Sequence, residues 1–260
     1  MPNAIEISQL SHAYGKVQAL RGVSLTIGRG ATVGLIGPDG VGKSTLLSLI
    51  AGVRTLQSGE VRVLGHNVAH KSERESLLPR IAFMPQGLGK NLYPTLSVYE
   101  NIDFHARLFG LNKHQRKQHI ERLMQSTGLA PFAGRLSGGM KQKLSLCCAL
   151  VHNPDLLILD EPTTGVDPLS RRQFWTLVRE LRAENPGMTV LVATAYIDEA
   201  EQFEQLLAMD DGRILAHGRT QEILAQSGCS TLEQAYIKML PEGKQTHWDD
   251  SQLPLFIPDD

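Results

Sequence analysis

The stretch GPDGVGKS at residues 37–44 combines glycines, a lysine and a serine at the spacing of a phosphate-binding loop. Glycines let the backbone curl, so that successive N–H groups and the N-terminus of a following helix point at a polyphosphate such as ATP. Lys43 would add a positive charge for the β- and γ-phosphates, the Ser44 hydroxyl is placed for Mg²⁺, and Thr45 supports the same region. The alternative is a glycine-rich turn that caps an ordinary helix. The predicted ATP-binding residues of this stretch are Gly37, Pro38, Asp39, Gly40, Val41, Gly42, Lys43, Ser44 and Thr45.

A pair of carboxylates ends the apolar stretch LLILDEP, which is typical of a buried strand. Asp160 and Glu161 would lie at the carboxyl end of a parallel strand, beside the phosphate loop. Asp160 suits the coordination shell of Mg²⁺, and Glu161 would then polarise a water aimed at the γ-phosphorus. A solvated acidic turn would explain either residue alone, but it does not explain the pair together with the phosphate loop.

A third stretch, LSGGM at residues 136–140, predicts another helix N-terminus that could bind an anion. Ser137 is a natural N-cap, Gly138 and Gly139 follow it, and apolar residues recur at helical spacing beyond them. One chain does not need two phosphate-cradling helix ends for one nucleotide. The third stretch is therefore expected to serve something other than the nucleotide bound by the phosphate loop.

The chain must position these stretches with alternating strands and helices, which predicts an α/β fold. The first strands, up to about residue 28, are expected to pair antiparallel around the turn AYGK. A helical insertion is predicted over residues 96–128, and a hairpin with Asp211 and Gly212 at its turn follows later. Short helices are expected at TQEILAQ and TLEQAYIKML. Later strands are expected at ATVGLIG, GEVRVLG, RIAFMPQ, DLLILDEP and MTVLVAT.

Taken together, these motifs resemble the ATP-binding domain of ATP-binding cassette (ABC) proteins, over about residues 5–218. The resemblance implies a P-loop NTPase core with a mainly parallel, RecA-like sheet, an antiparallel β subdomain and an α-helical subdomain. It implies an ATP-binding domain at residues 1–240, with the helical subdomain inserted at about 88–152. Residues 241–260 gain prolines and acids, and are expected to form a linker or disordered tail that leads to a second cassette in a longer protein.

The resemblance also implies roles for individual residues. In this family two cassettes close head to tail around two ATP molecules, and Ser137–Gly139 would contact the γ-phosphate held by the opposite cassette. Tyr14 falls where the family stacks an aromatic ring on adenine, although a tyrosine in a hairpin turn is often only a turn residue. Gln86 matches the glutamine that contacts Mg²⁺ and the attacking water. Asp167 matches the loop that crosses the dimer interface.

One position departs from the family pattern. Members that hydrolyse ATP well carry a histidine where this chain has Ala195, and that histidine hydrogen-bonds the γ-phosphate. Loss of one donor to transition-state charge costs about 3 kcal/mol, or about two orders of magnitude in rate. The chain's own site is therefore expected to bind ATP and hydrolyse it slowly, paired with a competent partner. The alternatives are that Tyr196 or an ordered water replaces the histidine, or that this branch of the family is simply slow.

Within the family, GMKQK and the segment after Gln86 resemble exporters whose transmembrane subunits are of the ABC-2 type, including multidrug exporters. Several stretches also resemble the first cassette of two-cassette exporters and of a bacterial ribosome-associated ATPase. The leading expectation is an exporter ATPase held at the inner face of the bacterial plasma membrane by its partners. A ribosome-associated ATPase is the alternative, and a small-molecule kinase is a weaker one, since a kinase has no use for LSGGM.

Composition limits the other classes of function. Lys plus Arg is 26 and Asp plus Glu is 27, so a net charge of −1 provides no electrostatic case for direct nucleic-acid binding. Three cysteines form no disulfide framework and indicate a reducing compartment, the cytoplasm. No apolar run approaches the roughly 18 residues of a membrane span. Three histidines on polar helix faces lack a metal-binding pattern and are expected to be solvated, namely His105, His114 and His119.

Overall fold

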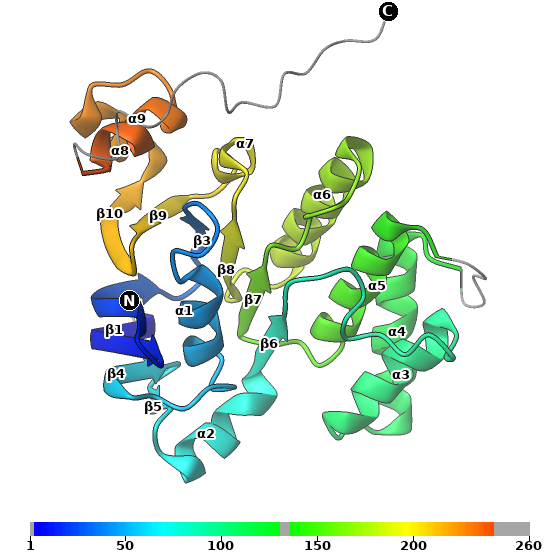
Figure 1. Ribbon diagram of the computed structural model, residues 1–260. Helices are drawn as coiled ribbons and strands as arrows, with labels where there is room; N and C mark the ends of the chain where they lie inside the picture. The colour runs from blue at the N-terminus through cyan, green and yellow to red at the C-terminus, as the bar shows by residue number, and fades with distance from the viewer. Residues whose placement is uncertain (1–2, 131–135, 242–260) are drawn as a thin grey trace, which may run out of the picture.

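The computed structural model describes residues 3–130 and 136–241. Its centre is a six-stranded sheet in the order β10-β9-β3-β8-β7-β6 (Figure 1). The five strands from β9 to β6 run parallel, and β10 closes one edge antiparallel through the predicted hairpin. These strands are β3 (Thr32–Ile36), β6 (Ile81–Met84), β7 (Leu156–Asp160), β8 (Thr189–Thr194), β9 (Gln205–Asp210) and β10 (Arg213–Arg219).

A second sheet, all antiparallel, has the order β2-β1-β4-β5. The long strands β1 and β2 pair through the turn after Tyr14, where Gly15 adopts φ 59°, a left-handed value that suits glycine. This sheet confirms the antiparallel subdomain expected from the first segments of the sequence. Its strands are β1 (Asn3–Tyr14), β2 (Val17–Gly28), β4 (Ser58–Val63) and β5 (His66–Asn67).

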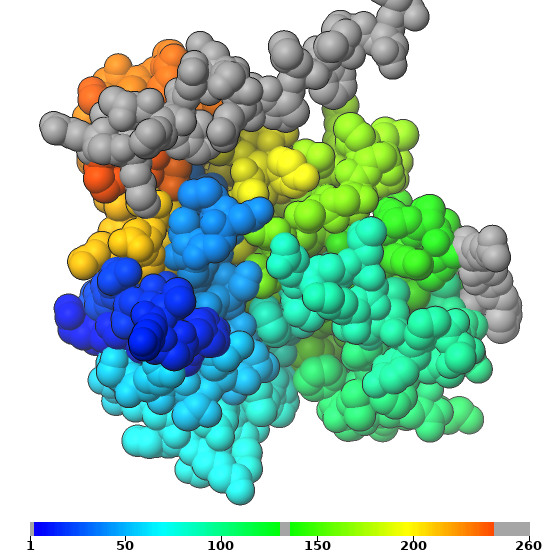
Figure 2. Space-filling view, in the orientation of Figure 1, coloured from blue at the N-terminus to red at the C-terminus, as the bar shows by residue number. Residues whose placement is uncertain are grey.

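Helices cover both faces of the central sheet and form a separate lobe beside β6 (Figure 1). The lobe consists of α3 (Val98–Leu108), α4 (Lys113–Thr127) and α5 (Gly138–Leu150), which contact one another. In Figure 2 the surface of this lobe and that of β1 lie on opposite sides of the molecule. The remaining helices are α1 (Lys43–Ile50), α2 (Lys71–Leu77), the 3₁₀ turn η1 (Leu78–Arg80), α6 (Pro168–Glu184), α7 (Ile197–Ala200), α8 (Thr220–Ser227) and α9 (Leu232–Met239).

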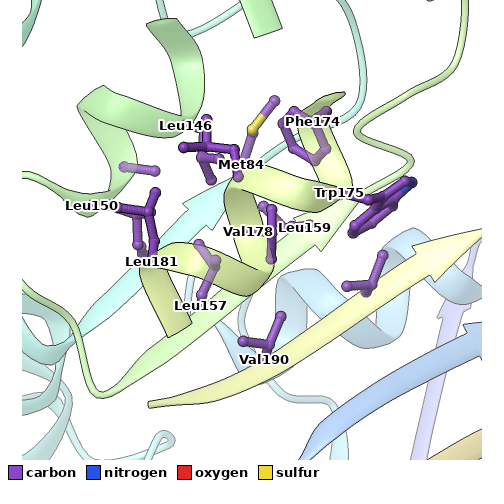
Figure 3. Packing of buried hydrophobic residues seen from close by; sticks show 14 of the residues in the cluster. Met84, Leu146, Leu150, Leu157, Leu159, Phe174, Trp175, Val178, Leu181 and Val190 are labelled. Carbon is purple, nitrogen blue, oxygen red and sulfur yellow. The ribbon is translucent and has the colours of Figure 1, made fainter. Parts of the chain in front are cut away.

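The central strands are buried on both faces, and alternate residues enter two different apolar clusters. Leu157 and Leu159 of β7 pack with α5 and α6, as Figure 3 shows, whereas Leu156 and Ile158 face the cluster around α1. This alternation is the period-two geometry of a strand, and burial on both faces explains the continuous apolar sequence of β7. The sheet is therefore a rigid base from whose carboxyl-terminal edge loops can project.

The helical lobe begins with two well-capped helices. Ser97 and Glu100 form a capping box at the start of α3, and Asn112 and Gln115 form one at the start of α4. The helix α4 ends at Gly128 in the left-handed conformation, φ 66°. The insertion therefore starts and stops where local sequence signals place its helices.

Histidines connect this lobe to its surroundings, which corrects part of the sequence interpretation. His105 lies 3.0 Å through Nε2 from the carbonyl oxygen of Asn91, and His119 lies 2.7 Å through Nδ1 from that of Val151. Both rings therefore bind backbone rather than only water, because the loop and helix ends beside them leave unpaired carbonyls. His152 similarly contacts the carbonyl of Ile81 at 3.2 Å and stacks on Phe109. Of the three histidines expected to be solvated, only His114 is exposed.

Two further expectations concern cysteines and the membrane. Cys147 and Cys148 are buried in α5 without a disulfide, and burial raises the pKa of the Cys147 thiol to about 12. Among the helices of the described residues, none combines the length and apolar character needed to cross a bilayer. The linker expected at residues 241–260 falls, beyond Pro241, outside the described residues.

Candidate active site

The phosphate loop connects β3 to α1 at the carboxyl-terminal edge of the parallel sheet. Gly37 and Gly42 have φ values of 154° and 106°, and both lie against backbone. A side chain at Gly37 would overlap the carbonyl of Met209 in β9, and one at Gly42 would overlap the carbonyl of Ala19 in β2. Glycine is therefore required here for conformation and for space, because the loop is held between the two sheets.

Lys43, the first residue of α1, is 4% exposed and points back over the loop. Its ammonium donates to the carbonyls of Gly37 at 2.8 Å and Pro38 at 3.0 Å, and lies 3.4 Å from the Glu161 carboxylate. A buried charge requires such partners, since desolvation is costly. The lysine is thus held in position by oxygens that surround the place where phosphate oxygens would enter.

The two predicted carboxylates follow β7 and face different partners. Asp160 accepts a hydrogen bond from the Ser44 hydroxyl at 3.0 Å, and Glu161 accepts one from the Gln86 amide at 2.6 Å. Burial raises the pKa of Asp160, and the neighbouring Glu161 charge acts in the same direction, while the Ser44 bond opposes them. The hydroxyl, carboxylate and amide oxygens of Ser44, Asp160 and Gln86 are hard ligands of the kind that Mg²⁺ takes. The structure brings together all four residues.

Glu161 has an unusual backbone that separates its side chain from that of Asp160. Its φ is 48°, in the left-handed region, and its N–H donates to the carbonyl of Ala193 in the neighbouring strand β8 at 2.9 Å. Such a conformation is costly for a residue with a β-carbon and persists when its surroundings hold it. This turn lets consecutive carboxylates serve two different positions of one site.

Most of these groups line a pocket of about 400 Å³, here called the phosphate-loop pocket; Asp160 and Gly37 are not among the described residues that line it. Tyr14 lies at its rim, 42% exposed, with its hydroxyl 3.2 Å from the Thr45 hydroxyl. A partly exposed aromatic ring beside a phosphate loop is suited to stacking on a nucleobase. The residues that line the pocket are Tyr14, Val17, Gln18, Ala19, Asp39, Gly40, Gly42, Lys43, Ser44, Thr45, Gln86 and Glu161.

The LSGGM stretch lies outside this pocket, since no residue of α5 is among the described residues that line it. Ser137 is the exposed N-cap of α5, and its hydroxyl accepts from the N–H of Met140 at 3.2 Å. A side chain at Gly139 would overlap Ser170 of α6, so glycine lets α5 and α6 approach each other there. Asp167 is exposed at the N-cap of α6, and its hydrogen bonds with Ser170 lower its pKa. The N-terminal ends of α5 and α6 therefore lie close together on the surface.

Ala195 is exposed and directly follows β8. The side chains next to it in sequence contact residues outside the phosphate-loop pocket. Residues 194–200, here called the switch segment, contain Glu199, which is 1% exposed. Its carboxylate accepts from the hydroxyls of Thr163 at 2.6 Å and Thr194 at 2.8 Å. Thr163 lies two residues after Glu161, so the Glu199 carboxylate joins the loop after β7 to the end of β8.

Arg171 of α6 holds the other side of the switch segment. Its guanidinium carbon lies 4.2 Å from the centre of the Tyr196 ring, and its Nε lies 3.7 Å from the Glu199 carboxylate. Tyr196 thus stacks against α6, and it is not among the described residues that line the phosphate-loop pocket. Sequence reasoning missed this cluster of Arg171, Glu199 and two threonines, because its members lie in three separate stretches with no shared spacing.

Comparisons with known proteins agree with this geometry. The family model described as ABC transporter matches residues 20–164. The chain is 43% identical over 209 residues to the Escherichia coli protein named "Probable multidrug ABC transporter ATP-binding protein YbhF", covering 79% of this chain and 35% of that protein. It is 32% identical to the linearmycin resistance ATP-binding protein LnrL of Bacillus subtilis, over 92% of this chain and 76% of the relative. The chain thus spans about a third of the length of the first of these relatives.

Solved structures show the same fold. An ATP-binding subunit of an ABC transporter superposes with a TM-score of 0.78 at 28% identity, covering 91% of this chain and 99% of that one. A dimeric post-hydrolysis state of the ATP-binding cassette MJ0796, bound to ADP and Pi, gives a TM-score of 0.72 at 26% identity, covering 83% and 98%. The parallel core, the antiparallel sheet and the helical lobe are therefore those of the ABC ATPase fold. This chain is an ATP-binding, ATPase domain of the ABC transporter family.

Proposed function

We propose that this chain is the ATPase subunit, or one half of the ATPase pair, of an exporter of the drug-resistance type. The observation that carries the proposal is the division of the site into two parts. Binding and hydrolysis residues surround the phosphate-loop pocket, whereas Ser137 and its helix N-terminus lie exposed outside it. A second cassette packed head to tail would bring its own pocket against that helix end. Homologues named as multidrug or antibiotic resistance proteins support the exporter class.

In this proposal each residue of the pocket has one task. Lys43 and the loop N–H groups bind the phosphates, and Tyr14 stacks on adenine. Ser44, Asp160 and Gln86 would hold Mg²⁺, which supplies charge neutralisation of the phosphates when bound. Glu161, held by Gln86 at 2.6 Å, orients the attacking water and accepts its proton.

The exposed Ser137–Gly139 segment then acts on the partner's nucleotide. Its free N–H groups and the positive end of the α5 dipole favour a γ-phosphate presented from outside. Asp167 lies nearby on the same surface, at the start of α6, where it would cross the dimer interface. Neither segment needs to move into the chain's own pocket for this role.

A groove supports a transmembrane partner of the ABC-2 type over a ribosome. It has a volume of about 510 Å³ and lies between residues 88–96, α3 and α5. Leu88 and Tyr93 on this groove are 41% and 47% exposed, and large exposed apolar side chains are typical of interaction sites. A helix of a membrane subunit would bury them and feel any movement of the helical lobe. In this proposal the partner would hold the chain at the cytoplasmic face of the membrane.

Ala195 makes the chain's own site slow in this proposal. Its methyl group can donate no hydrogen bond to the γ-phosphate, and Tyr196 is stacked under Arg171 instead of facing the pocket. The chain would then hold ATP as a clamp while Ser137 completes the competent site of its partner. Because one cassette holds ATP and the other hydrolyses it, this division of roles requires an asymmetric pair of cassettes.

Steady-state ATPase activity of the chain with Mg²⁺ tests the proposal, beside the variants Ala195→His and Glu161→Gln. We expect little activity in the parent, an increase of about tenfold to a hundredfold in Ala195→His, and none when Glu161→Gln is added to that variant. Brisk hydrolysis by the parent, abolished by Glu161→Gln, would contradict the slow site and favour a symmetric homodimer. Co-purification with ribosomes instead of membrane protein would contradict the exporter role.

A further inference from the structure

Tyr14 is held from both ends of α1. At the start of the helix, the Thr45 hydroxyl lies 3.2 Å from the Tyr14 hydroxyl. Beyond the end of the helix, Gln57 accepts the N–H of Ala13 at 2.7 Å and donates to its carbonyl at 3.0 Å. Arg54, in the same connection, places its guanidinium carbon 4.9 Å from the centre of the Tyr14 ring. The aromatic ring and the phosphate loop are thus both anchored to α1.

The contacts leave one side of the ring open. Tyr14 lines the phosphate-loop pocket together with Val17 and Ala19, but Arg54 is not among the described residues that line it. His12, which is 4% exposed, meets the ring edge-on at a centroid distance of 5.0 Å. Burial lowers the pKa of His12, and the Arg54 charge lowers it further. Arg54 and His12 therefore support the ring, and the pocket side remains free.

We propose that Arg54 is a positioning residue for the nucleobase, which stacks on Tyr14 from the pocket side while the Arg54 guanidinium stacks on the opposite side. The inference rests on the proposed role of Tyr14. Because Arg54 and Gln57 follow the same helix that begins with Lys43, the distance from the stacking ring to the phosphate site is set before ATP binds. The segment 54–57 then determines how well the chain selects a nucleoside triphosphate over a bare polyphosphate.

The physical reason is preorganisation. A ring that is 42% exposed on a four-residue turn would otherwise lose rotamer freedom when the base binds, and this ordering opposes binding. A planar guanidinium fixes the ring by stacking and remains charged at every relevant pH, whereas the ammonium of a lysine cannot stack in the same way. The positive charge also attracts the triphosphate over a longer range, so a test must separate stacking from charge.

The test compares the affinities of MgATP and of magnesium tripolyphosphate, measured by calorimetry on the full chain. We expect Arg54→Ala to weaken MgATP binding about fivefold, the size of a partly exposed cation–π contact, and to change tripolyphosphate binding less than about twofold. Arg54→Lys should recover part of the loss. Lys16→Ala also removes one positive charge, from the exposed turn that follows Tyr14, and it should not alter the preference for ATP over tripolyphosphate.

A second arm uses Tyr14→Ala. In that background Arg54→Ala should have no further effect on MgATP affinity, because the residue acts through the ring. Equal losses for both ligands, or additive losses in the double variant, would overturn the inference and assign Arg54 to long-range charge. If Tyr14→Ala alone leaves MgATP affinity unchanged, the proposed stacking role of Tyr14 fails first. Thermal unfolding of each variant confirms that the turn remains folded.

Discussion

The phosphate-loop pocket and the switch segment lie side by side at the edge of the same sheet, yet their polar groups serve opposite purposes. In the pocket, Lys43 and Gln86 bind oxygens that a nucleotide or water could replace. In the switch segment, Glu199 is sealed between two threonine hydroxyls and Arg171, and Ala195 has no polar side chain at all. The polar groups of the pocket can exchange their partners for a ligand, whereas those of the switch segment hold the segment against the loop after β7 and against α6. The groups proposed to contact the nucleotide therefore lie in the pocket, and the polar side chains of the switch segment contact one another and these two elements instead.

This separation predicts how the two regions respond to mutation. A change at a phosphate-binding residue of the pocket, such as Lys43, should alter nucleotide affinity, because the ligand's contacts lie there. A change in the switch segment should alter turnover or folding stability and leave affinity almost unchanged. Any variant that violates this division would show that the two regions act as one.

The largest effect is expected from Lys43→Met, which keeps an unbranched side chain one atom shorter and removes its charge. Loss of charged hydrogen bonds to the phosphates should weaken MgATP binding by about 3 kcal/mol, or about a hundredfold. Calorimetry on the chain alone measures this affinity. The matched control is Ala195→His, whose MgATP affinity should stay within about threefold of the parent. A similar loss of affinity in both variants would break the comparison.

A smaller effect is expected from Glu199→Gln. The amide can accept from one threonine only and carries no charge beside the Arg171 guanidinium, so the two buried hydrogen bonds and the ion pair are weakened, at a cost of about 2 kcal/mol. Urea denaturation should reveal this loss as a lower midpoint, with MgATP affinity unchanged. Glu201→Gln provides the control, since Glu201 is exposed directly after this segment. Equal stability of the two variants would show that the Glu199 carboxylate does not anchor the segment.

An effect of similar size concerns pH and the lobe that carries Ser137. Burial lowers the pKa of His152 to about 4, below its ordinary value of 6.5. The folded chain therefore binds fewer protons than the unfolded chain between these values. The stabilisation is complete above about pH 6.5 and is lost as the pH falls towards 4, by about 1 kcal/mol per pH unit for one proton.

The variant His152→Phe checks this assignment, because it keeps an aromatic ring against Phe109 and cannot titrate. Denaturation of both proteins at pH 7 and pH 5 should show a smaller loss of stability in the variant. MgATP binding by the parent at pH 5 should survive if acid loosens the helical lobe without disturbing the phosphate loop. An identical pH response in both proteins would assign the acid sensitivity to other groups.

The sequence predicted the pocket better than its surroundings, for a physical reason. Lys43, Ser44, Asp160 and Glu161 lie in two continuous stretches whose strand and turn signals are local, and the structure places them together. Their roles in binding and hydrolysis stay predictions. The β hairpin, the helices of the lobe and the N-cap at Ser137 were likewise predictable from short-range signals.

The cluster around Glu199 could not be predicted in this way. A buried carboxylate requires hydrogen-bonding or charged partners, and here two of them come from the loop after β7 and from the helix α6. The spacing of residues along the sequence does not indicate which distant elements supply such partners. His105 and His119 teach the same lesson, because their carbonyl partners lie 14 and 32 residues away. Because both histidines lie on polar helix faces, the sequence wrongly predicted that their side chains are solvated.

The position of Gly37 against the carbonyl of Met209 has a consequence for how this protein is made. The phosphate loop is synthesised early, but the strand on which it rests, β9, leaves the ribosome about 170 residues later. A nascent chain that stops before β9 contains every residue of the loop and its contact with β2, but it lacks the strand against which Gly37 rests. We therefore expect nucleotide binding to be a late event in cotranslational folding, with ATP stabilising the finished domain rather than the early chain.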